Sequence, residues 1–332
     1  MTDLARSDVS FPLADWILSH SGVPHNLSLS GMTGELTTVR RLLNDPRPGP
    51  SDPEDLRRAL AQVHRVSRDR IVLTHGATES NALVATSWMR RRRAASGALL
   101  VRRPEYPPLG DGARALGFHP QRHPRGARGG VLSNPWNPEG RLWSSEDVLA
   151  WGGSLRNVLI DEIFREFTPG PGAASWHGGR VRFWVSSSFT KIYGADEIRL
   201  GYVIAPEEEA KNLEDLSALL LDPPARASVT AGLRLLRNRD RILQESRELF
   251  RRNLRILRDL VPGVPELAAP VWFDRGRGRL PSRRLSQAAL KGGVLVGPGE
   301  LFGDGRGVRI CLTRRSFERD LRAYLKVRRR FL

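Results

Sequence analysis

Short apolar runs recur along the first two thirds of the chain, and each is followed by a polar turn and then by a helical pattern or a loop. Helical patterns stand at residues 79–93 and 110–116. The strands that we expect lie at residues 71–74, 98–101, 131–133, 158–161, 181–186 and 201–205. Continuous apolar strands that alternate with helices favour a mostly parallel sheet sandwiched by helices.

The last third of the chain has a different pattern. An amphipathic helical stretch covers residues 228–260 and ends before Pro262 and Pro265. After it come an expected strand at 270–274, a Gly-rich stretch at 292–307, a strand at 308–312 and a helix at 316–330. The pattern predicts a second, smaller α/β unit, so the expected fold class is α/β with a large and a small domain.

The net charge of the chain bears on whether it binds nucleic acid or another anionic partner. The chain has 332 residues with 53 Lys plus Arg against 36 Asp plus Glu, and its formal net charge is +17. Such a charge is typical of proteins that bind nucleic acid or anionic substrates, and also of an arginine-biased proteome. The densest runs, residues 90–93 and 328–330, contain no aromatic residues for base stacking, and we interpret them as solvated helix ends. We therefore expect no nucleic-acid partner.

Cysteine, histidine and hydropathy exclude other classes. The one cysteine, Cys311, cannot form an intramolecular disulfide, and its strand-like surroundings indicate a small buried side chain. The only close histidine pair, His119 and His123, lies in a loop rich in Pro, Arg and Gly, so we assign no metal site. No membrane span and no secretory leader stand out, so we expect a soluble, cytoplasmic protein without a membrane partner.

The position of one lysine, Lys191, suggests that its amine takes part in covalent chemistry. The chain has four lysines, and Lys191 lies between two apolar runs, whereas Lys211, Lys291 and Lys326 lie in polar helical or turn contexts. Arginine can replace lysine as a surface cation, but it cannot act as an amine nucleophile or form a Schiff base. Burial would lower the pKa of the Lys191 amine towards its nucleophilic form. The alternative is that a coding bias left four lysines at random positions.

Polar residues follow several of the expected strands at their carboxyl ends, where ligands bind in sheets of this kind. The segment HGATES lets the backbone turn at Gly76 and then opens a helix whose free amides favour a phosphate. Each residue of this set, taken singly, has a plain structural reading as a turn or cap residue. The set comprises Gly76, Ala77, Thr78, Tyr106, Asn134, Asn137, Asp161, Ser188, Lys191 and Arg199.

In this order the set resembles the pyridoxal-phosphate enzymes of the aspartate-aminotransferase fold. It is most similar to the class I/II aminotransferases that include histidinol-phosphate aminotransferase. The motifs that carry the resemblance are NPWNPEG, VLIDEIFREF and SSFTKIYGADEIRLGY. The resemblance implies fold type I and pyridoxal 5'-phosphate as cofactor. We expect a large domain at residues 45–250 and a small domain formed by residues 1–44 and 251–332.

The resemblance also implies a role for each matching residue. Lys191 would form the Schiff base and then move the substrate's proton, with Asp161 and Tyr106 completing the catalytic set. Arg309, in GVRICLT, and Asn137 would bind substrate, and the segment around Gly31 would contact the substrate side chain. The implied cofactor ligands are Gly76, Ala77, Thr78 and Ser188 with Arg199 at the phosphate, and Asp161, Asn137 and Tyr106 at the ring.

The implied activity is transfer of an amino group between an L-amino acid and a 2-oxo acid by a homodimer. A decarboxylase, lyase or oxidase on the same fold remains open, as does a regulator that keeps the cofactor without catalysis. The sequence departs from the family's pattern at Phe164, where tyrosine is usual, and at Glu139, where threonine is common. It also has no tyrosine before Tyr106 that could reach a partner's cofactor phosphate.

Overall fold

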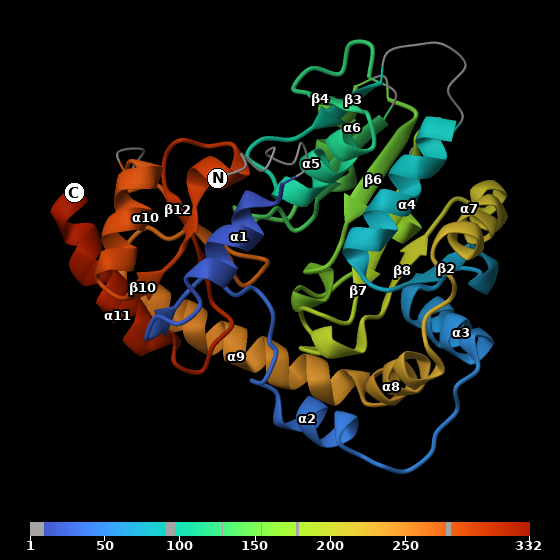
Figure 1. Cartoon of the computed structure of the whole chain (residues 1–332), viewed down its shortest axis with the longest axis horizontal. Coiled ribbons are helices and arrows are strands. Elements are labelled where there is room, and N and C mark those ends of the chain that lie inside the picture. Colours follow the sequence, from blue (N-terminus) through green and yellow to red (C-terminus); the bar gives the residue numbers. More distant parts are fainter. Residues whose placement is uncertain (1–9, 91–96, 128, 154, 177–178, 277–279) are drawn as a thin grey trace, which may run out of the picture.

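The computed structural model describes residues 10–90, 97–127, 129–153, 155–176, 179–276 and 280–332. Two sheet regions stand side by side, and one long helix runs along both of them (Figure 1). We call them the large region, which contains a seven-stranded sheet, and the small region, which contains two short sheets. The expected α/β fold class is confirmed.

The large sheet has the strand order β2-β8-β7-β6-β5-β3-β4. Strand β8 is antiparallel to both of its neighbours, and the remaining pairs are parallel, so the sheet is mostly parallel as expected. Its strands are β2 (Ile71–Thr74), β3 (Ala98–Val101), β4 (His119–Gln121), β5 (Gly129–Ser133), β6 (Asn157–Asp161), β7 (Arg182–Ser188) and β8 (Gly201–Ile204).

Helices cover both faces of this sheet, because successive residues of each strand point to opposite faces. On β2, Val72 packs into a core with α4, α5 and α7, whereas Ile71 and Leu73 pack into the other core with α3, α6 and α8. These helices are α3 (Pro53–His64), α4 (Ala77–Arg90), α5 (Pro107–Ala115), α6 (Ser145–Gly152), α7 (Glu207–Leu220) and α8 (Arg226–Arg237).

The small region combines the C-terminal part of the chain with the N-terminal segment. Its antiparallel sheet has the order β11-β12-β9, and a second sheet pairs β1 with β10 in parallel. The strands are β1 (His25–Asn26), β9 (Val271–Asp274), β10 (Val294–Leu295), β11 (Gly297–Pro298) and β12 (Val308–Cys311). Its helices are α1 (Pro12–Ser19), α10 (Ser282–Lys291) and α11 (Phe317–Arg328), whereas α2 (Thr37–Leu43) packs against α8 and α9 (Arg239–Leu260). Helix α9 runs from the large region to the small one (Figure 1).

Short 3-10 turns lie in the connections between these elements. Two of them, η4 and η5, come close to functional residues discussed below. Their bounds are η1 (Arg68–Arg70), η2 (Arg165–Phe167), η3 (Ala173–Ser175), η4 (Asp196–Ile198), η5 (Gly299–Phe302) and η6 (Arg329–Phe331).

Several helix predictions need correction. The continuous helix expected over residues 228–260 is two helices, because the Asn238 side chain donates to the carbonyl of Arg234 at 2.9 Å and ends α8. The helix expected at 79–93 begins at Ala77, and residues 91–93 lie outside the described residues. The Gly-rich stretch 292–307 contains β10, β11 and η5, whose short strands carry too few residues to show a period.

The interpretation of residues 328–330 as a solvated helix end is wrong for its first residue. The guanidinium of Arg328 binds the buried carboxylate of Asp274 at 2.5 Å and 3.0 Å. The Tyr324 hydroxyl donates to the same carboxylate at 2.8 Å. Arg329 and Arg330 are exposed. The helix end is therefore anchored on one side and solvated on the other.

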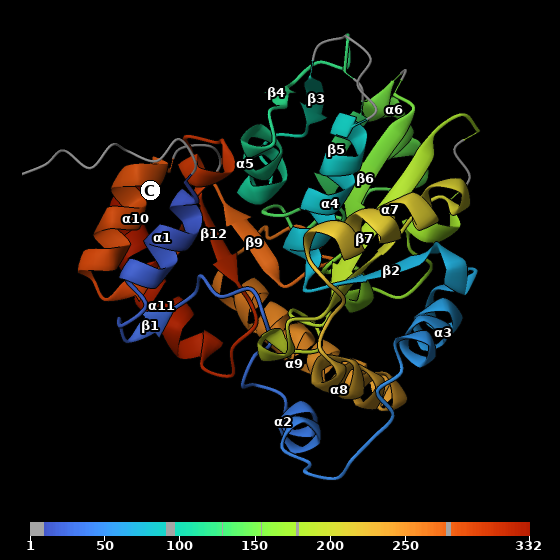
Figure 2. The same ribbon diagram turned by 45° about the vertical axis from the view of Figure 1, so that its right-hand side comes forward.

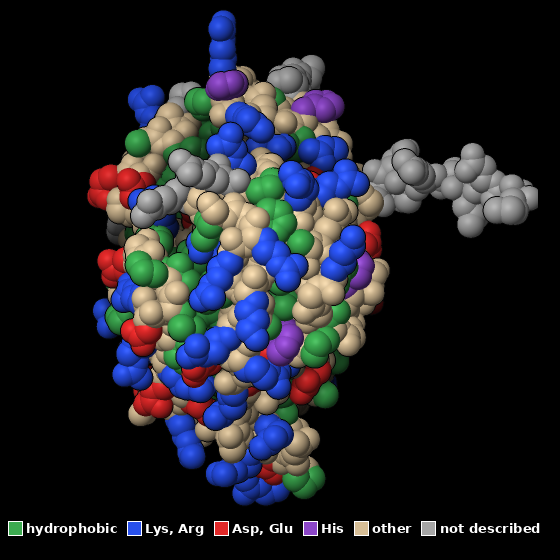
Figure 3. All heavy atoms as spheres, turned by 90° about the vertical axis from the view of Figure 1, so that its left-hand side faces the viewer, with side chains coloured by type: hydrophobic (Ala, Val, Ile, Leu, Met, Phe, Trp, Pro, Cys, Tyr) green, Lys and Arg blue, Asp and Glu red, His purple; other side chains and the backbone are tan. Residues whose placement is uncertain are grey.

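The positive charge gathers on the outer face of the small region. Figure 3 shows Lys and Arg side chains spread over this face, with few acidic side chains between them. The exposed cations of α10 and α11 are Arg283, Arg284, Lys291, Arg319, Arg322 and Lys326. Among the described residues, no helix is long and apolar enough to cross a membrane.

Candidate active site

The register of the large sheet brings the predicted site residues to one edge. Ser188 at the end of β7 is paired with Gly201 of β8, which is also paired with Thr74 of β2. Strand β6 lies next to β7 and ends at Asp161, which is paired with Ser186 of β7. The loops that follow β2, β6 and β7 therefore meet beside β9 and β12 of the small region, with α9 and α8 crossing below (Figure 2).

The loop after β2 forms a cradle for an anion. Gly76 has φ +133°, and a Cβ at this position would lie 3.2 Å from Nη2 of Arg199, so the guanidinium lies directly over the glycine. Helix α4 begins at the next residue, Ala77, and the first amides of a helix have no partner within the helix. The amides of Ala77 and Thr78, with the Arg199 cation, thus provide donors and positive charge suited to a phosphate.

Ser188 lies at the same end of the sheet. Its hydroxyl is hydrogen-bonded to the hydroxyl of Thr190 at 2.8 Å and accepts from the Thr190 amide at 3.3 Å. This turn carries the chain directly into Lys191. The sequence pattern Ser188-x-x-Lys191 therefore places a hydroxyl and an amine on one short loop beside the cradle.

Asp161 is buried at the end of β6, with 3% of its surface exposed. Its carboxylate accepts hydrogen bonds from Nδ2 of Asn81 and from the amide of Ile163, both at 3.1 Å. Ser186 donates to Oδ1 of Asn81 at 2.6 Å and so fixes the orientation of that amide. Burial raises the pKa of Asp161, and the two donors and the Lys191 amine oppose that shift. Sequence reasoning missed Asn81.

Lys191 is half-buried. Burial lowers the pKa of its amine, the nearby Arg309 cation lowers it further, and Cys311, Asp196 and Asp161 act in the opposite direction. The direction of this shift is the one expected from the sequence. The shift favours the neutral amine, which is the form that can act as a nucleophile or a base.

The N-terminal segment passes directly over Lys191. The Met32 amide donates to the Lys191 carbonyl at 3.0 Å. A Cβ on Gly31 would lie 3.1 Å from the Thr190 carbonyl oxygen and 3.7 Å from Cδ of Lys191. Gly31 therefore lies beside the Lys191 side chain, and a larger residue there would crowd this side chain.

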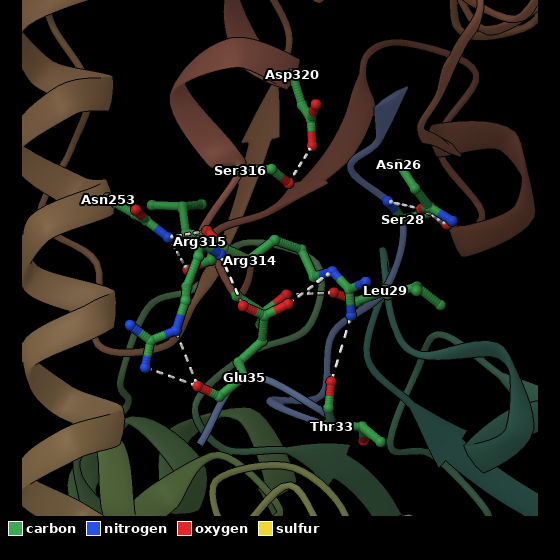
Figure 4. Close-up of polar contacts among 12 residues, drawn as sticks. Asn26, Ser28, Leu29, Thr33, Glu35, Asn253, Arg314, Arg315, Ser316 and Asp320 are labelled. Carbon is green, nitrogen blue, oxygen red and sulfur yellow. Dashed lines mark hydrogen bonds and ion pairs between the residues drawn. The ribbon is translucent and has the colours of Figure 1, made fainter. Parts of the chain in front are cut away.

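Arg314 and Arg315 hold this segment in place (Figure 4). The Arg314 guanidinium contacts the Glu35 carboxylate at 3.1 Å and the Thr33 carbonyl at 3.3 Å. Arg315 donates to the Glu35 carbonyl at 2.9 Å and 3.0 Å, and the Thr313 hydroxyl donates to the carbonyl of Leu29 at 2.6 Å. The loop after β12 thus positions the segment around Gly31.

Arg309 is a buried cation on β12, with 2% of its surface exposed. It donates to the Ser28 carbonyl at 2.8 Å and to Oδ1 of Asn137 at 3.3 Å, and its guanidinium lies 4.9 Å from the ring centroid of Phe302. Its Nε has no hydrogen-bond partner among the residues that the structure describes. A buried cation without a carboxylate partner is suited to an anionic ligand.

Tyr106 stands at the start of α5, near both Asp161 and Arg309. Burial raises the pKa of its hydroxyl to about 12, with a further contribution from the Asp161 charge. The ring of Phe11 packs edge-on against it, with centroids 6.3 Å apart. The Tyr106 ring thus has a fixed neighbour on one side, and we expect the hydroxyl to stay protonated at neutral pH.

The departures from the family pattern also have defined surroundings. Phe164 is buried and packs against Phe167, with ring centroids 6.2 Å apart. Glu139 forms an ion pair with Arg275 at 2.5 Å, which joins the loop after β5 to the end of β9. Among the described residues, no group of three or more His, Cys, Asp and Glu side chains is placed to hold a metal ion.

Comparison with known proteins identifies the family. The model of aminotransferase class I and II matches residues 47–320, and the chain belongs to this family. A histidinol-phosphate aminotransferase of Halobacterium salinarum is 30% identical over 208 residues, which are 58% of this chain and 54% of that protein. A threonine-phosphate decarboxylase of Pseudomonas aeruginosa is 31% identical over 109 residues, 31% of this chain and 33% of that protein. The chain spans about half the length of the first of these relatives.

Solved structures share the whole fold. A PLP-dependent aminotransferase from Streptococcus suis superimposes with a TM-score of 0.80 at 19% identity, covering 100% of this chain and 99% of that one. N-succinyldiaminopimelate aminotransferase from Mycobacterium tuberculosis gives 0.79 at 17% identity, covering 96% and 97%. These likenesses establish fold type I for the described chain.

Pyridoxal 5'-phosphate is the cofactor that this family membership implies, and the residues present fit it. The cradle at Gly76 would be filled by any Cβ, and it offers amides and a guanidinium to a dianion. Asp161 offers a buried carboxylate to a protonated ring nitrogen, and Lys191 offers an amine of lowered pKa to an aldehyde.

Proposed function

We propose that the protein is a pyridoxal-phosphate-dependent aminotransferase that exchanges an amino group between an L-amino acid and a 2-oxo acid. The observation that carries this proposal is that Asp161 and Lys191, which belong to different elements, lie at one edge of the large sheet. Asp161 ends β6, and Lys191 lies in the turn that follows the neighbouring strand β7. The charges of Asp161 and of Arg309 on β12 both influence the pKa of the Lys191 amine. The proposed cofactor ligands are Gly76, Ala77, Thr78, Tyr106, Asn137, Asp161, Ser188, Lys191 and Arg199.

Each residue has a task that its surroundings support. Bound cofactor would supply the electron sink for the pair of electrons left when the α-proton is removed. Lys191 would accept that proton as the general base, which requires the neutral amine that burial favours. Arg309 binds the α-carboxylate through two parallel donors and so fixes the direction of the α-carbon bonds.

The remaining residues hold this geometry. With the cofactor bound, Asp161 would keep the ring nitrogen protonated, Asn137 would donate to the ring's oxygen, and Tyr106 would cover the ring face. Gly31 leaves room beside Lys191 for the substrate. Because Phe164 has no hydroxyl, Asn137 is the donor to the ring oxygen that we assign among these residues.

The larger organisation is proposed on the same basis. We place the large domain at residues 45–250 and the small domain at residues 1–44 and 251–332, and the pairing of β1 with β10 supports the joining of the two ends. The boundary at residue 250 falls within α9. We further propose a cytoplasmic homodimer that acts on small molecules, with neither nucleic acid nor membrane as a partner.

The experiment that tests the activity is a single turnover of cofactor-loaded protein with a panel of L-amino acids and no added acceptor. We expect release of the corresponding 2-oxo acid in an amount close to that of the protein. Release of carbon dioxide, ammonia or hydrogen peroxide instead would assign a decarboxylase, a lyase or an oxidase, and would contradict transamination. No product with any amino acid would favour a regulator.

A further inference from the structure

The buried carboxylate of Glu105 contacts two segments that carry proposed cofactor ligands, one with Tyr106 and one with Asn137. It has 4% of its surface exposed and precedes Tyr106 in the loop after β3. Its Oε1 accepts hydrogen bonds from the Tyr106 amide at 2.8 Å and from the Ser133 hydroxyl. Its Oε2 accepts from the Ser133 amide at 3.0 Å and from Arg102 at 3.1 Å. All four interactions use Glu105 as an acceptor, which an ionised carboxylate satisfies.

The chain of hydrogen bonds continues to Asn137. The Asn137 amide donates to the Ser133 hydroxyl oxygen at 2.9 Å, and the single hydroxyl proton of Ser133 is donated to Glu105. The direction of each bond is thereby fixed, because Ser133 has one proton to give. The Glu105 carboxylate and the Ser133 hydroxyl together therefore link the backbone of Tyr106 to the backbone of Asn137.

Other contacts fasten the same two loops together. The Trp136 indole donates to the Pro104 carbonyl at 2.7 Å. The Arg102 guanidinium donates to the Ser133 carbonyl and lies 4.3 Å and 4.4 Å from the ring centroids of Trp136 and Trp143. Hydrogen bonds therefore join the loop after β3, which carries Tyr106, to the loop after β5, which carries Asn137. We call these two loops the joined loops.

The joined loops also contact the surroundings of Arg309, the proposed substrate-binding arginine. The Glu105 amide donates to the Phe302 carbonyl at 3.0 Å, and the Phe302 ring lies under the guanidinium of Arg309. Arg309 in turn donates to Oδ1 of Asn137. Glu105 is therefore bonded directly to Tyr106, through the Ser133 hydroxyl to Asn137, and through its own amide to Phe302, whose ring packs against Arg309.

We propose that Glu105 is a positioning residue that sets the distance between Tyr106 and Asn137, and so the orientation of the cofactor ring between them. This inference rests on the proposed function, and Glu105 itself touches neither cofactor nor substrate. Glutamine cannot replace it without losing a hydrogen bond, because its NH2 group would face the Ser133 amide and Arg102 in one orientation and the Tyr106 amide in the other. Alanine at position 133 would remove the hydroxyl that both neighbours use.

The test compares Glu105→Gln and Ser133→Ala with Glu209→Gln, using the visible circular dichroism of the bound cofactor as a readout of ring orientation. Glu209 is the matched control, because it is an equally buried acid that accepts from Arg182 at 3.0 Å, at the end of β7 opposite to Ser188. We expect the first two variants to lose about half of the visible signal and about tenfold in kcat, with KM changed less than about threefold. Glu209→Gln should keep the wild-type signal and kcat.

Two outcomes would overturn the inference. Wild-type signal and kcat in Glu105→Gln and Ser133→Ala, or equal losses in Glu209→Gln, would show that the carboxylate has no specific positioning role. If Glu105→Gln does not fold, Ser133→Ala decides alone, since it removes a neutral group and buries no charge. A wild-type protein that takes up no cofactor would instead contradict the proposed function, and the two failures are thereby separated.

Discussion

The side-chain amide of Asn81 donates a hydrogen bond of 3.1 Å to the carboxylate of Asp161, a residue 80 positions further along the chain. Asn81 lies within α4, the helix whose first turn forms the anion cradle. In the proposed site, one helix would therefore serve both ends of the cofactor, with its first amides at the phosphate and with Asn81 holding Asp161, the proposed partner of the ring nitrogen. This arrangement ties the position of Asp161 to the position of the cradle.

Replacing Asn81 with alanine should raise the pKa of Asp161 further above its ordinary value, because a donor that favours the ionised form is lost. Asp161 acts in its ionised form, so activity is lost as pH falls through its pKa. The acid limb of the kcat/KM profile should therefore move to higher pH, and activity at neutral pH should fall about tenfold or more. An unchanged acid limb would contradict the role of Asn81.

Replacing Arg309 with lysine should weaken substrate binding, since an ammonium group cannot make the planar two-point contact of a guanidinium with a carboxylate. We expect KM for the amino acid to rise about 100-fold, with cofactor uptake retained. The matched control is Arg319→Lys on the exposed surface of α11, which should leave KM unchanged. Equal KM values in the two variants would remove Arg309 from the substrate site.

Replacing Gly76 with alanine should weaken cofactor binding. The new Cβ would lie 3.2 Å from the Arg199 guanidinium and would stand at φ +133°. Cofactor Kd, measured by fluorescence titration, should rise about tenfold. Gly263→Ala has a comparable positive φ of +80° with open space around it, so it should cost stability without changing cofactor Kd. A cofactor Kd that is equally affected in both variants would argue against the cradle.

Replacing Arg328 with alanine should destabilise the fold, because it leaves the buried Asp274 carboxylate without its cation. Loss of one partner of a buried ion pair costs about 3 kcal/mol in the free energy of unfolding. Arg330→Ala, two residues further on and exposed, should change it by less than about 0.5 kcal/mol. Urea denaturation measures both, and equal values would contradict the anchoring of this helix end.

The sequence predicted the parts of the site that follow strands. Asp161, Ser188 and the Gly76 turn stand where an apolar run ends, and a parallel sheet brings such ends to one edge whatever the details of packing. The strand boundaries at residues 71–74 and 98–101 agree with the structure for the same reason, since both runs are apolar throughout and end at a polar turn.

The parts that could not be predicted depend on contacts between distant elements. Asn81 reads as one more polar residue of a helix, and its role appears only once α4 is packed against β6. Glu105 reads as a loop carboxylate until β3 and β5 are paired side by side. The break at Asn238 was hidden because both α8 and α9 are amphipathic and follow one another directly.

The central claim is that Lys191 holds the cofactor covalently. Borohydride reduction of cofactor-loaded protein, followed by peptide mass spectrometry, tests it most directly. We predict that the cofactor mass is fixed to Lys191, that Lys191→Ala retains none, and that Lys211→Ala behaves as wild type, because Lys211 is exposed and paired with Asp215. Cofactor fixed to Lys211, Lys291 or Lys326, or no modified peptide at all, would contradict the account.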